Sequence, residues 1–196
     1  MSQARQRRCS EAEYLESERR SPVRHEYLRG AVFAMAGASA VHNLIASNVL
    51  RALGSAIEHR PCIALGSDQR IHVDATGLYT YPDVSVVCGP PQFHTADPLS
   101  ITNPVLLVEV LSATTEDYDR GAKFAHYRAI PSLCEVLLVA QDEVRFDHYR
   151  RLDTGQWLLT ELRSGLVDLP CLGVSLELTA AYAKVELLEG PAAAGG

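Results

Sequence analysis

The sequence lacks the features of a secreted, disulfide-rich or membrane-spanning protein. Its five cysteines are an odd number, and no two of them form a C-x-x-C pair. No apolar run approaches the roughly 18 residues of a membrane helix, and the arginine-containing N-terminus has no apolar stretch after it. We therefore expect no signal peptide, no membrane span and a cytoplasmic location. We expect reduced, small core residues rather than disulfides or zinc ligands at Cys9, Cys62, Cys88, Cys134 and Cys171.

The sequence also lacks an excess of positive charge. Eighteen Lys and Arg residues face 24 Asp and Glu residues, which gives a net charge of −6. This balance argues against a tight, nonspecific nucleic-acid binder, although it does not exclude a local basic surface.

No repeat and no long linker divides the 196 residues, and the hydrophobic fraction of 47% is ample for a core. We predict a single domain over residues 10–188, with flexible tails at 1–9 and 190–196.

Apolar periodicity predicts both helices and strands along the chain, in a mixed α/β (α+β) order with N- and C-terminal hairpins. Helices are expected from Ser10 to before Ser21, over 38–59 with Ser39 as cap, over 117–129, and within 176–188. Strands are expected at 24–28, 31–35, 62–65, 67–73, 135–140, 144–151 and 157–162, and an irregular loop at 89–104. Two more are expected around Asp83 within 81–87, stopped by Gly89, and around Glu109 within 104–112.

Two carboxylates stand out within this apolar pattern. Asp83 opens the run Val84–Val87, and Glu109 interrupts the run Val105–Leu111. Ionised carboxylates are costly to bury unless they are paired or bind a cation. If adjacent strands bring the two together, a divalent metal between them would relieve their repulsion. The sequence therefore favours a metal site here.

The order of acid, strand, acid, helix and lysine resembles the PD-(D/E)xK restriction-endonuclease-like nuclease superfamily. Pro82-Asp83 matches the "PD" and Glu109 the second acid. The wider pattern looks like the Uma family of putative restriction endonucleases. It comprises Tyr81-Pro82-Asp83-Val84, Val108-Glu109-Val110-Leu111-Ser112, Tyr118–Arg128, Ile130-Pro131-Ser132-Leu133, Met35–Ser39 and His42-Asn43, and the likeness extends from about residue 10 to about residue 188.

The resemblance implies a restriction-endonuclease-like fold, in which helices flank a mixed central β-sheet. It also implies a metal-dependent endonuclease that hydrolyses DNA phosphodiester bonds with Mg²⁺ or Mn²⁺. The implied metal ligands are Asp83, Glu109 and the Val110 backbone carbonyl, and Glu26 would be an added ligand or support the metal-bound water. His42 would contact the metal, a water or the substrate phosphate. A homodimer with two symmetric sites is also implied.

One position departs from the superfamily pattern. The lysine of the common motif lies two residues after the second acid, where this chain has Leu111. The resemblance implies that Lys123, on the following helix, supplies the ammonium, orients or helps to deprotonate the attacking water, and stabilises developing negative charge.

Each of these residues also has a structural interpretation. Asp83 could cap a turn, Glu109 could pair with an arginine, and Lys123 could be a solvated charge on a helix whose face it shares with Arg120 and Tyr127. His42 and Glu26 could be structural groups.

Other polar residues are weaker candidates. Asp68, Arg70 and Tyr127 could support the site. Glu116, Asp117 and Asp119 are expected to form the solvated first turn of a helix. For the whole chain, the alternative to an active nuclease is a catalytically silent nuclease-fold module for nucleic-acid binding or assembly.

Overall fold

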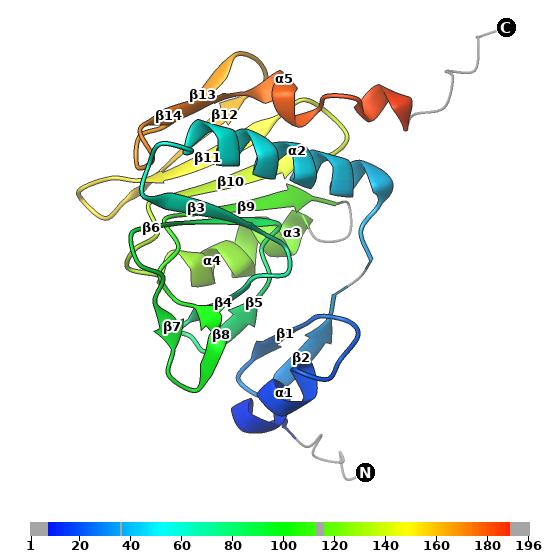
Figure 1. Ribbon diagram of the computed structural model, residues 1–196, viewed down its shortest axis with the longest axis vertical. Helices are drawn as coiled ribbons and strands as arrows, with labels where there is room; N and C mark the ends of the chain where they lie inside the picture. The colour runs from blue at the N-terminus through cyan, green and yellow to red at the C-terminus, as the bar shows by residue number, and fades with distance from the viewer. Residues whose placement is uncertain (1–7, 36, 113–115, 189–196) are drawn as a thin grey trace, which may run out of the picture.

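A computed structural model describes residues 8–35, 37–112 and 116–188 of the chain. The predicted tails at 1–9 and 190–196 lie almost wholly outside these residues. The molecule is elongated, with the N-terminal helix and hairpin at one end and the longest helix and the C-terminal segments toward the other (Figure 1). Within the described residues, no helix has the length and apolar character needed to cross a membrane.

The N-terminal helix and hairpin form as predicted. Helix α1 (Glu11–Glu18) starts with a capping box, in which Ser10 and Glu13 satisfy each other's backbone amides. Strands β1 (His25–Leu28) and β2 (Ala31–Ala34) pair antiparallel. Arg29 and Gly30 both have positive φ, as a tight two-residue hairpin requires.

The first six-stranded sheet has the order β2-β1-β5-β4-β8-β7. Its further strands are β4 (Arg70–Val73), β5 (Leu78–Thr80), β7 (Phe93–His94) and β8 (Asp97–Ile101). The predicted loop at 89–104 is therefore wrong, because it contains β7 and β8. A two-residue strand and a strand containing Pro98 carry no alternating pattern that would reveal them.

The second six-stranded sheet has the order β12-β11-β10-β9-β6-β3. Its members are β3 (Cys62–Gly66), β6 (Val84–Cys88), β9 (Leu106–Leu111), β10 (Glu135–Ala140), β11 (Phe146–Arg151) and β12 (Trp157–Leu162). All were predicted within a few residues. Strands β9 and β10 run parallel, whereas β6 and β9 run antiparallel.

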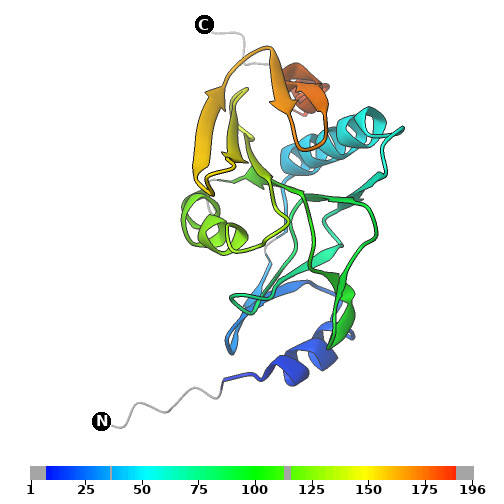
Figure 2. The same ribbon diagram turned by 90° about the vertical axis from the view of Figure 1, so that its left-hand side faces the viewer.

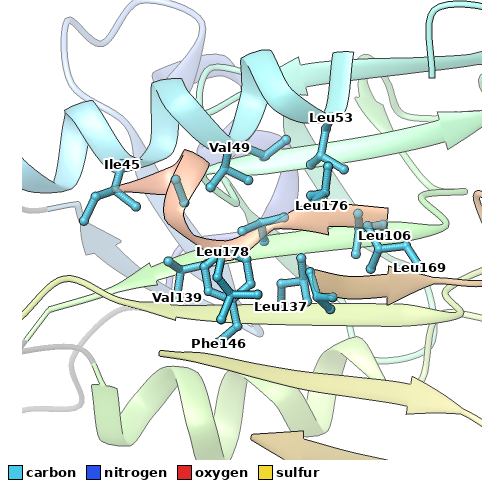
Figure 3. Packing of buried hydrophobic residues seen from close by; sticks show 14 of the residues in the cluster. Ile45, Val49, Leu53, Leu106, Leu137, Val139, Phe146, Leu169, Leu176 and Leu178 are labelled. Carbon is cyan, nitrogen blue, oxygen red and sulfur yellow. The ribbon is translucent and has the colours of Figure 1, made fainter. Parts of the chain in front are cut away.

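Helix α2 (Ala40–Ala56) covers one face of this second sheet, and Ser39 caps it as predicted. Its apolar stripe Ile45, Val49 and Leu53 packs on Leu106 and Val139, among others, to form the larger core (Figure 3). The alternation of a strand sends Leu106, Val108 and Val110 to this face. The intervening residues Leu107, Glu109 and Leu111 consequently face the other way.

That opposite face lies against a helical segment made of α3 (Glu116–Tyr118), η1 (Asp119–Lys123) and α4 (Phe124–Tyr127). Figure 2 shows α2 and this segment on opposite sides of the sheet. Leu107 and Leu111 join Phe124 and Tyr127 in a second core. The predicted helix at 117–129 exists, but η1 is a π-helix, which adds a residue to the turn and changes the faces of the residues within it.

The C-terminal part differs from its prediction. Strands β13 (Leu166–Leu169) and β14 (Val174–Glu177) form a separate hairpin that was not predicted from the sequence. The expected helix at 176–188 is reduced to one turn, α5 (Leu178–Ala181), and a 3-10 turn, η2 (Val185–Leu187).

The prediction that all five cysteines are reduced is also wrong, because Cys62 and Cys88 form a disulfide. The β3–β6 register places the two residues directly opposite each other, with Cα atoms 4.0 Å apart. Such a pairing depends on strand register, which the spacing of cysteines in the sequence does not reveal. Cys9, Cys134 and Cys171 are free.

We expect the Cys62–Cys88 disulfide to stabilise the protein. It spans a sequence separation of 26 residues, for which the chain-entropy model gives about 3.5 kcal/mol. Dithiothreitol should therefore lower the unfolding midpoint of the wild type and leave a Cys62→Ser/Cys88→Ser variant unchanged. Equal midpoints for the oxidised and reduced wild type would contradict this.

Candidate active site

Two antiparallel strands bring the predicted carboxylates together. Val84 of β6 lies opposite Val108 of β9, so one step further along this register sets Asp83 opposite Glu109. Asp83 stands just before β6, whereas Glu109 lies within β9 on the face toward α4. The register of β6 and β9 thus brings the two carboxylates together, as the sequence predicted.

Asp83 is held on both of its carboxylate oxygens. His42 Nε2, from the first turn of α2, lies 2.9 Å from Asp83 Oδ1, and the Val110 amide donates to Oδ2 at 2.7 Å. Both side chains, His42 and Asp83, remain 15% exposed. Asp83 therefore contacts a distant strand and helix, in contrast to a residue that only caps a local turn.

Glu109 pairs with Lys123, and no arginine contact is recorded for it in the described part of the chain. Lys123 Nζ lies 2.9 Å from Glu109 Oε1, and the Tyr127 hydroxyl donates to the same oxygen. Both charged side chains are 6% exposed. Lys123 is therefore a buried ammonium, and its interpretation as a solvated helix charge is wrong.

Glu26 enters the same cluster from β1 of the other sheet. Its Oε1 lies 3.3 Å from Lys123 Nζ and accepts a hydrogen bond from the Thr80 hydroxyl, while the Tyr118 hydroxyl donates to Oε2 at 3.3 Å. Strand β1 of the first sheet and strand β9 of the second sheet thus each supply a carboxylate that pairs with Lys123. All five predicted side chains lie in two contiguous groups, His42 with Asp83, and Glu26 with Lys123 and Glu109.

The π-helix corrects the prediction for two neighbours of Lys123. Asp119 is buried and lies 3.6 Å from Lys123 Nζ, so it is not part of a solvated first turn. Arg120 pairs with Glu116 and Asp147. Its partners differ from those of Lys123 and Tyr127, with which it was predicted to share a face.

The surroundings raise the pKa values of both Glu109 and Lys123. Burial raises the pKa of Glu109 to about 8, and the nearby Asp119 and Asp83 charges add to this rise, although Lys123 opposes it. The pKa of Lys123 is held well above its usual value, despite its burial, by Glu109 and the surrounding groups. An uncompensated negative charge therefore remains, which a cation would relieve.

A pH dependence of stability follows for the metal-free protein. The pKa of Glu109 is about 8 in the folded protein, above its usual value of 4.5. Its contribution to stability is therefore complete below about pH 4.5 and is lost as the pH rises through 8. In EDTA, the unfolding midpoint should fall between pH 6 and pH 9, and Glu109→Gln should flatten this fall. The exposed-site variant Glu58→Gln is the control, and an unchanged slope in Glu109→Gln would contradict the assignment.

The donor set suits a hard divalent cation. Three carboxylates (Glu26, Glu109 and Asp119) surround the Lys123 ammonium, and Asp83 lies opposite Glu109 on the neighbouring strand. Oxygen donors are those that Mg²⁺ and Mn²⁺ prefer. Within the described residues, three ligand atoms lie within 4.8 Å of one another in a different group, Glu11, His72 and His94, to which these carboxylates do not belong. Mg²⁺ is often bound by only one or two carboxylates, with waters and phosphate oxygens completing its shell. The residues therefore fit such an ion.

Four residues that were not predicted as site residues contact the cluster: Thr80, Tyr118, Asp119 and Tyr127. Tyr127 was considered only as a weak candidate, and its position one turn after Lys123 was the available signal. Two other weak candidates lie elsewhere, since Arg70 pairs with Asp97 and Tyr81, and Asp68 pairs with Arg24 near the surface.

The fold of the chain is shared with a solved structure. It superposes on the crystal structure of a putative nuclease belonging to DUF820 from Anabaena variabilis ATCC 29413 with a TM-score of 0.70 and 18% identity. The match covers 87% of this chain and 96% of that one. At this identity the likeness establishes the shared fold.

The family follows from the sequence comparison. The chain belongs to the Uma2 family, described as "Putative restriction endonuclease", whose model matches residues 11–181. It is 40% identical over 151 residues to the uncharacterised protein sll1609 of Synechocystis sp. (strain ATCC 27184 / PCC 6803 / Kazusa), covering 77% of this chain and 85% of the relative. It is 37% identical over 176 residues to slr1290 of the same organism, covering 89% and 92%. The predicted family is thereby confirmed.

Proposed function

We propose that the protein is an Mg²⁺- or Mn²⁺-dependent endonuclease that hydrolyses DNA phosphodiester bonds at the Asp83–Glu109–Lys123 cluster. The observation that carries the proposal is the convergence of acidic and basic side chains from β1, the start of α2, the β6–β9 pair and η1. Such a set of titratable groups with perturbed pKa values is typical of functional sites. Membership of a restriction-endonuclease family supports the same reaction class.

Asp83 and Glu109 hold the cation in this proposal, with the Val110 carbonyl and Glu26 completing the protein's share. The bound cation supplies charge neutralisation at the phosphate and an activated water. His42 fixes one oxygen of Asp83 and the Val110 amide fixes the other. Because His42 is partly exposed, it is also placed to meet a phosphate that approaches from solvent.

Lys123 acts as a charged hydrogen-bond donor. Three carboxylates surround its ammonium at 2.9–3.6 Å, and its pKa is raised. A group that keeps its proton is better suited to orient water and stabilise developing negative charge than to remove a proton. This favours one of the two roles that the resemblance implies for this lysine.

Three further features belong to the proposal. Residues 10–188 form one functional nuclease domain. Two copies act as a homodimer, so that paired sites address both strands of a duplex. The enzyme works in the cytoplasm on DNA.

A silent nuclease-fold module for nucleic-acid binding or assembly is the competing function. The net charge of −6 and Leu111 at the usual lysine position favour it. A buried Lys–Glu pair can also be purely structural. Against a structural role, one carboxylate is enough to compensate a buried lysine, whereas three carboxylates surround Lys123.

A metal-linked thermal shift separates the two functions at the binding step. At Mn²⁺ concentrations about 100-fold above the dissociation constant, we expect the melting temperature of the wild type to rise by about 5–10 °C. Asp83→Asn should abolish most of this rise, because it removes a ligand charge while keeping the side-chain shape. The readout is differential scanning calorimetry with Mn²⁺, Mg²⁺ and EDTA.

The matched control is Asp153→Asn, at an exposed turn position. It should retain the full Mn²⁺ shift. If the wild type shows no shift, or if Asp83→Asn keeps it, the proposed site is wrong and the silent module becomes the better account.

A further inference from the structure

A second cluster of potential metal ligands lies outside the Asp83–Glu109–Lys123 cluster. Glu11 at the start of α1, His72 on β4 and His94 on β7 each offer a ligand atom within 4.8 Å of the others. They come from three segments far apart in the sequence. Neither the family pattern nor the proposed nuclease chemistry uses them.

The hydrogen bonds of the two histidines leave one nitrogen of each ring available. His72 Nδ1 lies 2.7 Å from Asp74 Oδ1, and a carboxylate oxygen can only accept, so Nδ1 carries the proton. The Tyr79 hydroxyl donates to Glu11, so its oxygen accepts from His94 Nδ1 at 3.0 Å. No hydrogen bond to Nε2 of either ring is recorded within the described residues.

The surroundings keep the imidazoles suitable for metal binding. The His72 and His94 ring centroids are only 3.9 Å apart, a separation that disfavours two imidazolium charges. The His72 side chain is only 5% exposed, so little water competes for its free nitrogen. A carboxylate on the far nitrogen of a histidine is the usual support of a metal-bound ring, and Asp74 supplies it.

The donor chemistry differs from that of the nuclease cluster. Two imidazole nitrogens and one carboxylate form the His₂Glu set of many Zn²⁺ sites, with a fourth position left for water. Hard Mg²⁺ prefers an all-oxygen shell instead. A tetrahedral Zn²⁺ with bonds of about 2.0–2.1 Å sets neighbouring ligand atoms about 3.3 Å apart. The three ligand atoms already lie within 4.8 Å of one another, and the half-exposed Glu11 carboxylate can move closer to the two rings.

Access to the cluster exists from solvent. His72 also lines a surface hollow of about 350 Å³ together with Asp74, Thr102 and Ile130. His94 and Glu11 are 18% and 46% exposed at their side chains.

We propose that Glu11, His72 and His94 bind a divalent transition-metal ion of the Zn²⁺ type, which fastens α1 to the first sheet. The helix also contributes Tyr14 and Leu15 to a small core with Tyr27 and Tyr79, and its buried Glu18 accepts hydrogen bonds from His25 and Tyr81. An ion shared by α1, β4 and β7 joins this helix to two strands at once. The site is independent of the proposed nuclease activity.

The first test is Zn²⁺ titration of the full chain carrying Asp83→Asn, so that the nuclease cluster does not contribute. We expect one Zn²⁺ per chain by elemental analysis after dialysis and a melting temperature raised by about 5–10 °C at about 100-fold excess over the dissociation constant. Mg²⁺ should not compete. Tryptic cleavage after Arg19 and Arg20, which follow α1, should slow at least severalfold when Zn²⁺ is present.

Two variants, His94→Gln and Glu11→Gln, remove a proposed ligand. The matched control is His59→Gln, at an exposed position. The first two should weaken Zn²⁺ binding by at least about tenfold, and Glu11→Gln keeps an acceptor for Tyr79, so it should fold normally. His59→Gln should bind as the parent does. Absence of stoichiometric Zn²⁺ in the parent, or equal affinity across the three variants, would overturn the proposal.

Discussion

Replacement of Lys123 by methionine should both destabilise the protein and remove its activity. Methionine keeps the volume and the flexible stem of lysine but leaves Glu109, Glu26 and Asp119 without the ammonium that now lies 2.9–3.6 Å from each. Removing one partner of a buried ion pair typically costs about 3–5 kcal/mol. The expected measurement is a corresponding loss in the free energy of unfolding from urea titrations in EDTA.

The effect of Lys123→Met on cleavage should be separable from its effect on folding. At a temperature where the variant is folded, we expect Mn²⁺-dependent DNA cleavage to fall by about 10²–10⁴-fold, as for loss of a group that stabilises transition-state charge. Added Mn²⁺ should recover part of the lost stability, because it compensates the same carboxylates.

Lys184→Met is the matched control, since it makes the same chemical change at an exposed lysine. It should alter stability by less than about 0.5 kcal/mol and leave cleavage unchanged. If Lys123→Met behaves like Lys184→Met in both assays, Lys123 has neither the electrostatic nor the chemical role given to it here.

Glu109→Gln should have the largest effect on cleavage with the least effect on shape. Glutamine can still accept the Tyr127 hydrogen bond, but it lacks the negative charge that holds a divalent cation. We expect Mn²⁺-dependent cleavage to fall by at least about 10³-fold, since both binding of the cation and charge neutralisation at the phosphate depend on this carboxylate.

The same variant should be more stable than the wild type in EDTA at pH 9. Its buried amide carries no charge, whereas burial opposes ionisation of Glu109 and raises its pKa to about 8. Loss of activity together with gained metal-free stability distinguishes a metal ligand from a group that only supports the fold. Glu58→Gln should change neither quantity, and full activity of Glu109→Gln would exclude Glu109 from the site.

Much of the fold could be predicted because local patterns and tertiary structure agree. The Ser39 cap and the stripe Ile45, Val49 and Leu53 define α2, and alternating or continuous apolar runs define β6, β9 and β10. The mixed α+β class follows from these elements. Adjacent strands also bring the two acids together, as expected from carboxylates beside or within apolar runs.

The missed features depend on contacts that leave no local pattern. The strand β8 contains Pro98 and an exposed Leu99, so its pairing with β4 comes from the parallel register at Ser100 and Ile101. The Cys62–Cys88 disulfide likewise depends on which residues of β3 and β6 face each other.

The environment of Lys123 was the hardest part of the site to predict. The surrounding segment Glu116–Arg120 is rich in charge, which is typical of a solvated helix face. Burial of Lys123 and Asp119 arises because the π-helix turns both toward the sheet, and because Glu26 arrives from a distant hairpin. The family resemblance supplied both Lys123 and Glu26, whereas the periodicity of the sequence did not.

The most direct test of a metal-dependent nuclease is cleavage of supercoiled plasmid and linear duplex DNA by the purified wild type, with Mn²⁺ and with EDTA. Glu109→Gln, purified in parallel, controls for contaminating nucleases. We predict nicking or linearisation by the wild type with Mn²⁺ and none with EDTA or with the variant. No Mn²⁺-dependent cleavage of several substrates by the wild type, or equal cleavage by Glu109→Gln, would contradict the account.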